Sequence, residues 1–157
     1  MAKKRKAANT RQLSTADYVR LATFRLALRR FLHFSESAAA RVGLTGQQHQ
    51  AMLVLRSREG RAPVTINDLA RQLLIRHNSA VGLVDRLVVQ GLVARNHTPE
   101  DRRKVWLRLT RKGEGVLGNL AALHRLKLRR VGPDLNRVLA ELAGDSPRRR
   151  ASSSEDP

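Results

Sequence analysis

The stretch from Ile66 to Gly113 constrains the fold more than any other part of the chain. Two short helical patterns come first, at Ile66–Ile75 and Ser79–Gln90, and a basic hairpin follows at Arg95–Thr110. Helix, tight turn, helix and two strands around a charged loop is the order of a winged helix-turn-helix. Such a unit places one helix in a DNA major groove and the loop against the neighbouring backbone or minor groove. The order of elements therefore predicts a mainly α-helical chain with a small β wing.

The charge of the chain predicts a polyanionic partner. Lys and Arg number 31 against 13 Asp and Glu, which gives a formal net charge of +18. An excess of this size favours nucleic acid, with an anionic membrane surface or general stickiness as the alternatives. The hydrophobic content of 41% predicts a folded chain, and the aromatic content of 3% predicts a core built mostly of Leu and Val.

Several functional classes are disfavoured by what the sequence lacks. Without cysteine there are no disulfides, thiolate metal sites or thiol redox sensors. No run approaches about 18 apolar residues, and the basic N-terminus lacks the apolar core of a secretion signal, so we expect a cytosolic protein. The five histidines show no metal-ligand spacing, with a zinc site assembled across the fold as the alternative. No Gly-rich phosphate loop or Ser/His/Asp arrangement stands out, so we expect no cofactor and no enzyme.

Amphipathic helices are expected on both sides of the winged unit. Ser14 and Asp17 have the spacing of a capping box, and apolar residues recur every three or four positions over residues 18–32. Another helix is expected after its cap, Thr110, until Pro133 interrupts it, because a helix loses a hydrogen bond at proline. The same proline suits the first turn of a further helix. These helices need another surface on which to bury their apolar faces.

Local signals mark the helices inside the winged unit. Thr45 with Gln48 and Thr65 with Asp68 both have capping-box spacing. A turn is expected at residues 76–78, between the two helices of the pair. One apolar stripe of the first helix is expected to pack inward, and it consists of Ile66, Leu69, Ala70, Leu73 and Leu74.

The second helix of the pair separates into two faces on a helical wheel. The inward arc consists of Ala80, Val81, Leu83, Val84, Leu87 and Val88, and the outward face of Asn78, Gly82, Asp85, Arg86 and Val89. Glycine inside a helix costs roughly 1 kcal/mol relative to alanine. On the outward face Gly82 removes bulk where the backbone can approach DNA, and tolerated sequence drift is the alternative. Gly91 stands where a left-handed turn would end the helix.

The start and the outward face of this second helix are expected to contact DNA. His77, Asn78 and Ser79 lie at or near its N-terminus, where free backbone N–H groups can help them meet phosphates or base edges. Arg86 projects from the outward face one to two turns later. Its alternative role is a local ion pair with Asp85 or another neighbour.

The charged hairpin is the most specific of these features. Arg103 lies in its loop, where a planar guanidinium can enter a minor groove, and Asp101 is close enough to hold the direction of that side chain. The other cations suit phosphate contacts, which add affinity without reading sequence. These cations are Arg95, Arg102, Lys104 and Arg108. The alternative is a solvated loop with a local ion pair worth at most about 1 kcal/mol.

Two segments resemble the MarR (multiple antibiotic resistance regulator) family. The run D-R-R-K-V-W-L-R-L-T-R-K-G from Asp101 to Gly113 is similar to that family's D-x-R…L-T-x-x-G wing signature. The run from Leu83 to Arg95 resembles the end of its recognition helix and the strand that follows. The resemblance implies a homodimeric bacterial transcription factor, usually a repressor, whose two winged lobes each read half of a palindromic operator. It also implies that Arg103 is the minor-groove residue and Asp101 its orienting partner.

The resemblance further implies an organisation and an effector. Residues 15–44 would be an N-terminal dimerisation helix, residues 45–110 the DNA-binding lobe, and residues 111–143 C-terminal dimerisation helices. Residues 1–14 are expected to be a disordered basic arm, which either contacts DNA phosphates or is a solvated tail, and residues 144–157 a disordered tail. Small aromatic or phenolic ligands often bind between the dimer region and the lobe in this family, and they weaken DNA binding.

The chain also departs from the family pattern. Many members have a Ser/Thr-Val-Ser/Thr-Arg run where this chain has S-A-V-G at 79–82, so an arginine base contact is missing and the operator sequence cannot be transferred. The absence of cysteine excludes the thiol-oxidation branch. His33, Phe34 and His49 are candidates for a ligand pocket, with core or surface filling as the alternative.

The sequence therefore predicts a sequence-specific regulator that binds double-stranded DNA as a homodimer. Its two recognition helices would lie about 34–36 Å apart, or a multiple of that distance, to enter successive major grooves. The main alternative is an architectural nucleoid protein that coats DNA with little sequence preference, which the charge of +18 also suits. An enzyme acting on nucleic acid is a weaker alternative, because the sequence offers no acidic or metal cluster.

Overall fold

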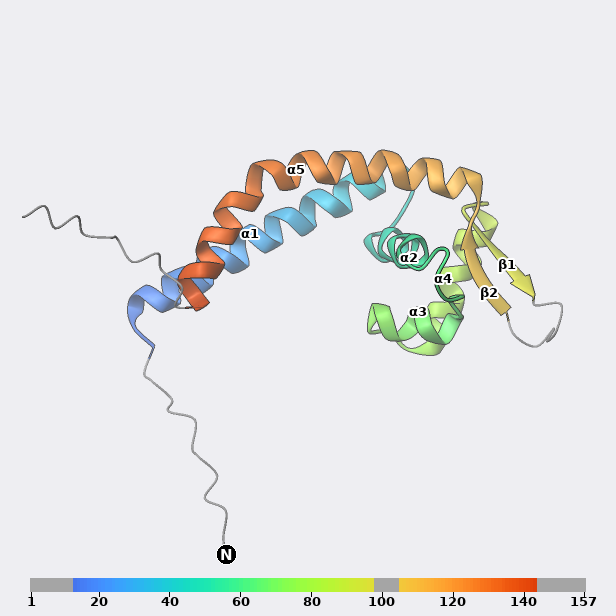
Figure 1. The fold of residues 1–157 in the computed structure, drawn as a ribbon, viewed down its shortest axis with the longest axis horizontal. Coiled ribbons are helices and arrows are strands. Elements are labelled where there is room, and N and C mark those ends of the chain that lie inside the picture. The colour runs from blue at the N-terminus through green and yellow to red at the C-terminus, as the bar shows by residue number, and fades with distance from the viewer. Residues whose placement is uncertain (1–12, 98–104, 144–157) are drawn as a thin grey trace, which may run out of the picture. The chain divides into compact units, whose positions relative to one another are not determined.

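The computed structural model describes residues 13–97 and 105–143 (Figure 1). The basic arm over residues 1–12 and the tail over residues 144–157 therefore lie outside the described residues, as does the hairpin loop over residues 98–104. The described residues form the mainly helical fold with a small antiparallel sheet that the sequence predicts. The elements in chain order are α1 (Thr15–Ala40), α2 (Gly46–Ser57), α3 (Ile66–Leu73), α4 (His77–Val89), β1 (Val93–His97), β2 (Val105–Leu109) and α5 (Arg111–Ala143).

The chain divides into two compact units. Of the described residues, the first unit holds 13–30 and 129–143, and the second holds 31–97 and 105–128. In the first unit, the predicted capping box at the start of α1 is confirmed, because the N–H of Asp17 donates to Ser14 Oγ at 3.2 Å and the N–H of Ser14 donates to the Asp17 carboxylate at 2.9 Å. Arg20 of α1 reaches Glu141 of α5 at 3.4 Å, so an ion pair joins the two helices.

The predicted break of the C-terminal helix at Pro133 is wrong. α5 continues through this proline from Arg111 to Ala143 as one helix. Proline removes one backbone donor, so one carbonyl of the preceding turn loses its partner. Pro133 is exposed, and a carbonyl on the exposed side of a helix can be hydrated. The structure therefore has a single long helix where the sequence predicted two.

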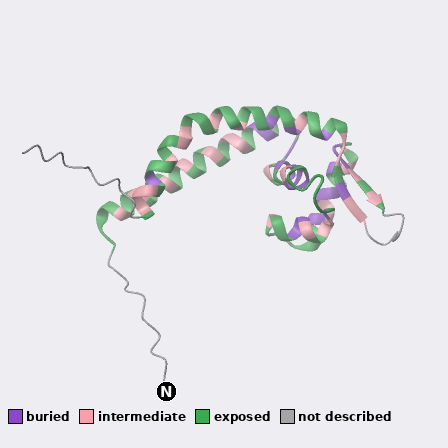
Figure 2. Ribbon diagram, viewed as in Figure 1, coloured by how far each residue is buried: buried purple, intermediate pink, exposed green. Residues whose placement is uncertain are grey.

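Both long helices expose large apolar side chains, and Figure 2 shows how little of either helix is buried. On α1 these side chains are Tyr18, Val19, Leu21, Leu26, Leu28 and Leu32, and on α5 they are Leu123, Leu126, Leu128 and Leu139. Scattered exposed leucines are common, but a succession along one helix marks a surface that is covered by another chain or ligand. α1 and α5 therefore carry apolar surface that the described residues of this chain leave uncovered.

The second unit holds the core that supports the winged region. Its largest fully buried side chains are Met52, Leu69, Leu83, Leu87, Leu120 and Val84. Both predicted capping boxes are confirmed, with Thr45 accepting from the N–H of Gln48 at the start of α2 and Thr65 accepting from the N–H of Asp68 at the start of α3. The Asp68 carboxylate in turn accepts hydrogen bonds from the Thr65 hydroxyl at 2.7 Å and from the Thr65 N–H at 3.0 Å, and these two bonds lower the pKa of Asp68.

The wing consists of β1, β2 and the loop between them. The strands pair antiparallel with Arg95 opposite Leu107, and Leu107 is buried against the core. Val64, just before α3, forms an isolated bridge to Leu107 on the other edge of β2. The wing is thus attached to the core through β2 and through the residue that precedes the helix pair.

Candidate nucleic-acid interface

The turn between α3 and α4 differs from the sequence prediction. α3 ends at Leu73, and Leu74 adopts a left-handed conformation with a φ of 55°. The Leu74 side chain is 92% exposed, so the prediction that it joins the inward stripe of α3 is wrong. The change of direction packs Ile75 against the core instead, with its N–H donating to the Ala70 carbonyl at 3.0 Å. The predicted turn at 76–78 is also displaced, because α4 begins at His77.

The first residues of α4 present backbone donors to the outside. Arg76 precedes the helix and makes no side-chain capping hydrogen bond, which leaves N–H groups of the first turn without a side-chain acceptor. His77, Asn78 and Ser79 are all exposed at this end. His77 Nδ1 lies 2.6 Å from the side-chain oxygen of Asn67 on α3, a contact that the sequence did not predict. The contact holds the ring beside the turn.

The two faces of α4 follow the helical wheel. The buried side chains are Ala80, Leu83, Val84 and Leu87, and the exposed ones on the opposite side include Asn78, Asp85, Arg86 and Val89. A Cβ at Gly82 would meet only Arg86 Nη1, at 3.6 Å, which is an ordinary contact. Packing inside the chain therefore does not require glycine at this position. With no side chain at Gly82, the helix backbone is open to close approach there.

Asp85 pairs with a strand residue rather than with its neighbour on the helix. Its carboxylate lies 2.5 Å from the Arg95 guanidinium on β1. This pair neutralises the one acidic side chain on the outward face of α4 and attaches the wing to that helix. Arg86 forms no ion pair with any acidic residue among residues 13–97 and 105–143, so its local-pair alternative gains no support there.

The base of the wing is described, but its tip is not. Arg108 is exposed on β2, and its Nε donates at 2.9 Å to Asn96 on β1 when the Asn96 amide takes the orientation that its neighbours favour. His97 and Val105 pair across the two strands at the point where the loop begins. Four residues predicted to contact DNA lie in that loop, outside the described residues: Asp101, Arg102, Arg103 and Lys104. Their roles stay predictions.

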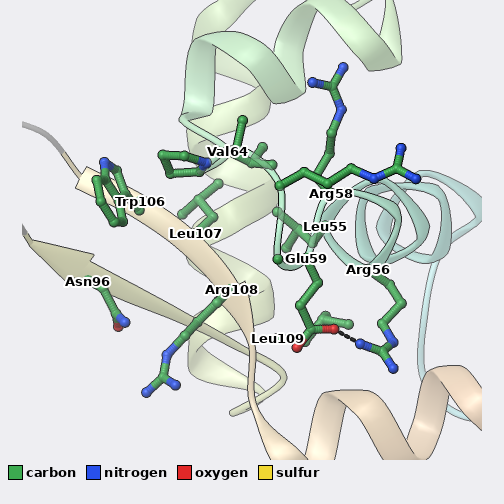
Figure 3. Close-up of a pocket in the computed structure, with 14 residues that line it drawn as sticks. Leu55, Arg56, Arg58, Glu59, Val64, Asn96, Trp106, Leu107, Arg108 and Leu109 are labelled. Carbon is green, nitrogen blue, oxygen red and sulfur yellow. Dashed lines mark ion pairs between the residues drawn. The ribbon is translucent and has the colours of Figure 1, made fainter.

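A pocket of about 250 Å³ lies between the end of α2, the segment that follows it and the two strands of the wing (Figure 3). Buried side chains of Leu55, Val64 and Leu107 line it, and Trp106 closes one side. Its rim carries four arginines and one glutamate, of which Arg56 and Glu59 pair with each other. In Figure 3 the labelled arginine side chains point in different directions rather than toward one point. Ligand sites usually combine an apolar pocket with converging polar groups, which this pocket lacks.

Two of the three candidates for a ligand pocket come together, and one does not. Phe34 and His49 both lie against His124 of α5, with ring centroids 5.6 Å and 4.8 Å away, whereas His33 is exposed. His124 in turn contacts the Ser35 hydroxyl at 2.7 Å. Burial, and then the charge of His124, lower the pKa of His49, whose Nε2 is buried without a hydrogen-bond partner in the described structure. The sequence did not indicate His124, because no local pattern connects it to α1 or α2.

Among the described residues, no group of three His, Cys, Asp or Glu side chains is placed to hold a metal ion. Within the same residues, no helix is both long enough and apolar enough to cross a membrane.

The winged region also matches known proteins. Residues 42–104 match the model of the MarR family. α2, the helix pair α3 and α4, and β1 lie within this segment, whereas β2 and the long helices α1 and α5 lie outside it. The part of the chain that resembles the MarR family is thus less than half of its 157 residues.

Solved structures of MarR-family proteins share the fold over most of the chain. The regulator AbsC of Streptomyces coelicolor is 26% identical with a TM-score of 0.67, covering 86% of this chain and 92% of AbsC. A mutant of MepR of S. aureus, solved bound to an oligodeoxyribonucleotide, is 17% identical with a TM-score of 0.63, covering 84% of this chain and 96% of that chain.

The similarity to curated sequences covers a shorter part of the chain. YfiV of Bacillus subtilis, an uncharacterized HTH-type transcriptional regulator, is 33% identical over 79 residues, which is 50% of this chain and 49% of YfiV. YkoM of the same organism is 28% identical over 71 residues, or 45% of this chain and 46% of YkoM. The chain thus spans about half the length of the curated relatives that it matches.

Proposed function

We propose that this chain is a MarR-type, sequence-specific transcriptional regulator that binds double-stranded DNA in the bacterial cytoplasm. The observation that carries the proposal is the outward face of α4. Arg86 is exposed there without an acidic partner among the described residues, and exposed polar residues surround an uncapped helix N-terminus. A helix with this face fits the major groove, where donors read base edges and backbone N–H groups meet phosphates.

The wing supports the same conclusion from a second side. The Asp85–Arg95 pair attaches β1 to α4, so the hairpin and the recognition helix are held as one surface. The loop at 98–104 carries Arg102, Arg103 and Lys104 in sequence, and we propose that Arg103 enters the minor groove with Asp101 orienting it. The other loop cations and Arg108 would contact phosphates.

We propose further that the chain acts as a homodimer on a palindromic operator. The exposed apolar side chains of α1 and α5 supply the surface that a second copy would bury. A dimer is also what the geometry of DNA favours, because two recognition helices about 34–36 Å apart enter successive major grooves on one side of the duplex. MepR, which has the same fold, has been solved bound to an oligodeoxyribonucleotide, in keeping with this proposal.

Repression that a small aromatic or phenolic effector relieves is the finer part of the proposal. The dimer would have two conformations that differ in the distance between its recognition helices. An effector can release the operator only if it binds these two conformations with different affinities. The cluster of Phe34, His49 and His124 is the aromatic surface that the second unit offers for such a ligand.

Selection of genomic DNA fragments by the purified full chain tests the proposal. We expect the bound fragments to share a palindrome and the chain to prefer it to unrelated duplex by about 10³-fold or more at physiological salt. An architectural nucleoid protein, which the charge of +18 also suits, would show little preference at the same salt concentration. A chain that is monomeric at micromolar concentration and indifferent to the duplex would refute the proposal.

A further inference from the structure

Leu74 combines two unfavourable features at one position. It is the only residue other than glycine with a positive φ among residues 13–97 and 105–143. A left-handed backbone brings Cβ close to the following carbonyl oxygen, which is why glycine or asparagine usually occupies such positions. The same side chain is 92% exposed, more than any other large apolar residue described. Neither feature stabilises the isolated chain, which points to a contact outside the chain.

The place of Leu74 in the fold limits what that contact can be. Leu74 lies three residues before the first residue of α4, and it lines a cleft together with residues of α3 and the turn. The cleft is lined by Asn67, Ala70, Arg71, Leu74, Ile75 and His77. The N-terminus of α4 is the part of a recognition helix that meets base edges, so the preceding turn faces the same groove.

The surroundings of Leu74 favour DNA over a second protein. Its neighbours in the cleft include the exposed guanidinium of Arg71, which pairs with Asp68, the exposed His77 ring and the uncapped N–H groups of α4. Hydrogen-bond donors around a single leucine suit a polyanion, whereas a protein interface needs a larger continuous apolar patch. In the DNA major groove, the apolar group presented at a base edge is the C5-methyl group of thymine.

We infer that Leu74 contacts a thymine methyl group in each half-site and thereby helps to specify the operator. The inference rests on the proposed function and names a residue outside the recognition helix and the wing. It also gives a reason for the conformation: the left-handed backbone directs the side chain away from the core, where Ile75 takes the inward place.

The test removes the methyl group from the DNA and the leucine from the protein, separately and together. Each thymine of the selected duplex is replaced by deoxyuridine, which keeps base pairing and deletes only the methyl group. Binding is followed by fluorescence anisotropy for the full wild-type chain and for Leu74→Gly. We expect deoxyuridine at one position of a half-site to weaken wild-type binding about fourfold, as for one methyl-sized apolar group. Leu74→Gly should lose that sensitivity and bind both duplexes equally.

Two controls protect the test from loss of structure. Leu74→Gly should be at least as resistant to urea as the wild type, because glycine adopts a positive φ without strain. Leu74→Asn tolerates the same backbone and should also lose the deoxyuridine effect. Val42→Ala changes another exposed apolar side chain, outside the helix pair, and should retain the wild-type sensitivity.

The outcomes separate this inference from the proposed function. If the chain prefers its operator but no deoxyuridine substitution weakens binding, this inference is overturned and the proposed function is not. A deoxyuridine effect that persists in Leu74→Gly overturns the inference as well, as does a change of oligomeric state in that variant without a change in thymine sensitivity. A wild-type chain that prefers no duplex overturns the proposed function, and this inference with it.

Discussion

Replacement of Gly113 by alanine should destabilise the chain, although alanine is the better helix former. Gly113 is buried in the first turn of α5, where its N–H donates to the Thr110 hydroxyl at 3.0 Å. A Cβ on Gly113 would lie 2.1 Å from the Leu92 carbonyl oxygen and 3.0 Å from the carbonyl carbon. That oxygen accepts a hydrogen bond from the Thr110 N–H at 3.0 Å. The obstacle is thus backbone and cannot rotate away.

The size of the effect follows from three contributions. Relief of the contact requires a shift of roughly 1 Å between the start of α5 and the start of β1, and overpacking of this kind typically costs about 1–3 kcal/mol. The same shift weakens the Thr110 to Leu92 hydrogen bond, which is worth about 1 kcal/mol. The better helix propensity of alanine returns about 1 kcal/mol. We therefore expect Gly113→Ala to lower the free energy of unfolding by about 2 kcal/mol.

The assay is urea denaturation, followed by fluorescence of Trp106, the one tryptophan of the chain, and by circular dichroism. Protein concentration is kept constant, because dimerisation would link stability to concentration. Gly115→Ala and Gly118→Ala are the matched controls, since a Cβ at either position has no neighbour within 4 Å. Both should raise the urea midpoint through helix propensity alone. If Gly113→Ala is as stable as these two variants, the steric argument is refuted.

Three further predictions concern DNA binding and pH. Arg103→Ala and Arg86→Ala should each weaken binding to the selected operator by about 1–3 kcal/mol in gel-shift titrations, and an unchanged affinity would contradict the assigned role. The logarithm of the binding constant should fall steeply with the logarithm of salt concentration, and removal of a phosphate contact in Arg108→Ala should reduce that slope by about one, which titrations from low to high salt measure. Burial and His124 lower the pKa of His49, so its stabilising effect is fully present above the unfolded pKa of about 6.5 and is lost as pH falls through that value toward the lower folded pKa. The urea midpoint should accordingly decrease on acidification below neutral pH, and His49→Leu should reduce the decrease.

Sequence patterns predicted what depends on near neighbours. The capping boxes at Thr45 and Thr65 need only a residue three positions away, and both form. The burial of Ala80, Leu83 and Leu87 follows from the helical period. The prediction for the first helix of the pair was wrong at its C-terminal end, because periodicity does not say where a helix stops. Leu74 continues the apolar spacing, but the chain has already turned there.

Contacts between distant segments were beyond the reach of these patterns. Asp85 and Arg95 come from different elements, and either could have paired with a closer residue in the sequence. His124 meets His49 only because α5 passes α2. The break expected at Pro133 was wrong for a different reason, because the loss of one hydrogen bond did not outweigh the continuity of the rest of the helix. Long-range packing decides such cases.

The junction between α4 and α5 has a mechanical consequence. The Lys112 ammonium donates to the Gln90 carbonyl at 2.8 Å, and the Thr110 hydroxyl donates to the Gly91 carbonyl at 2.7 Å. The two residues that follow α4, Gln90 and Gly91, are therefore both hydrogen-bonded to the start of α5. Because these hydrogen bonds are direct, a rotation of the start of α5 would move the end of α4 and its outward face as well. Inserting a few flexible residues after Thr110 would uncouple the two helices. Both helices would stay folded, but a movement of α5 would no longer be transmitted to α4.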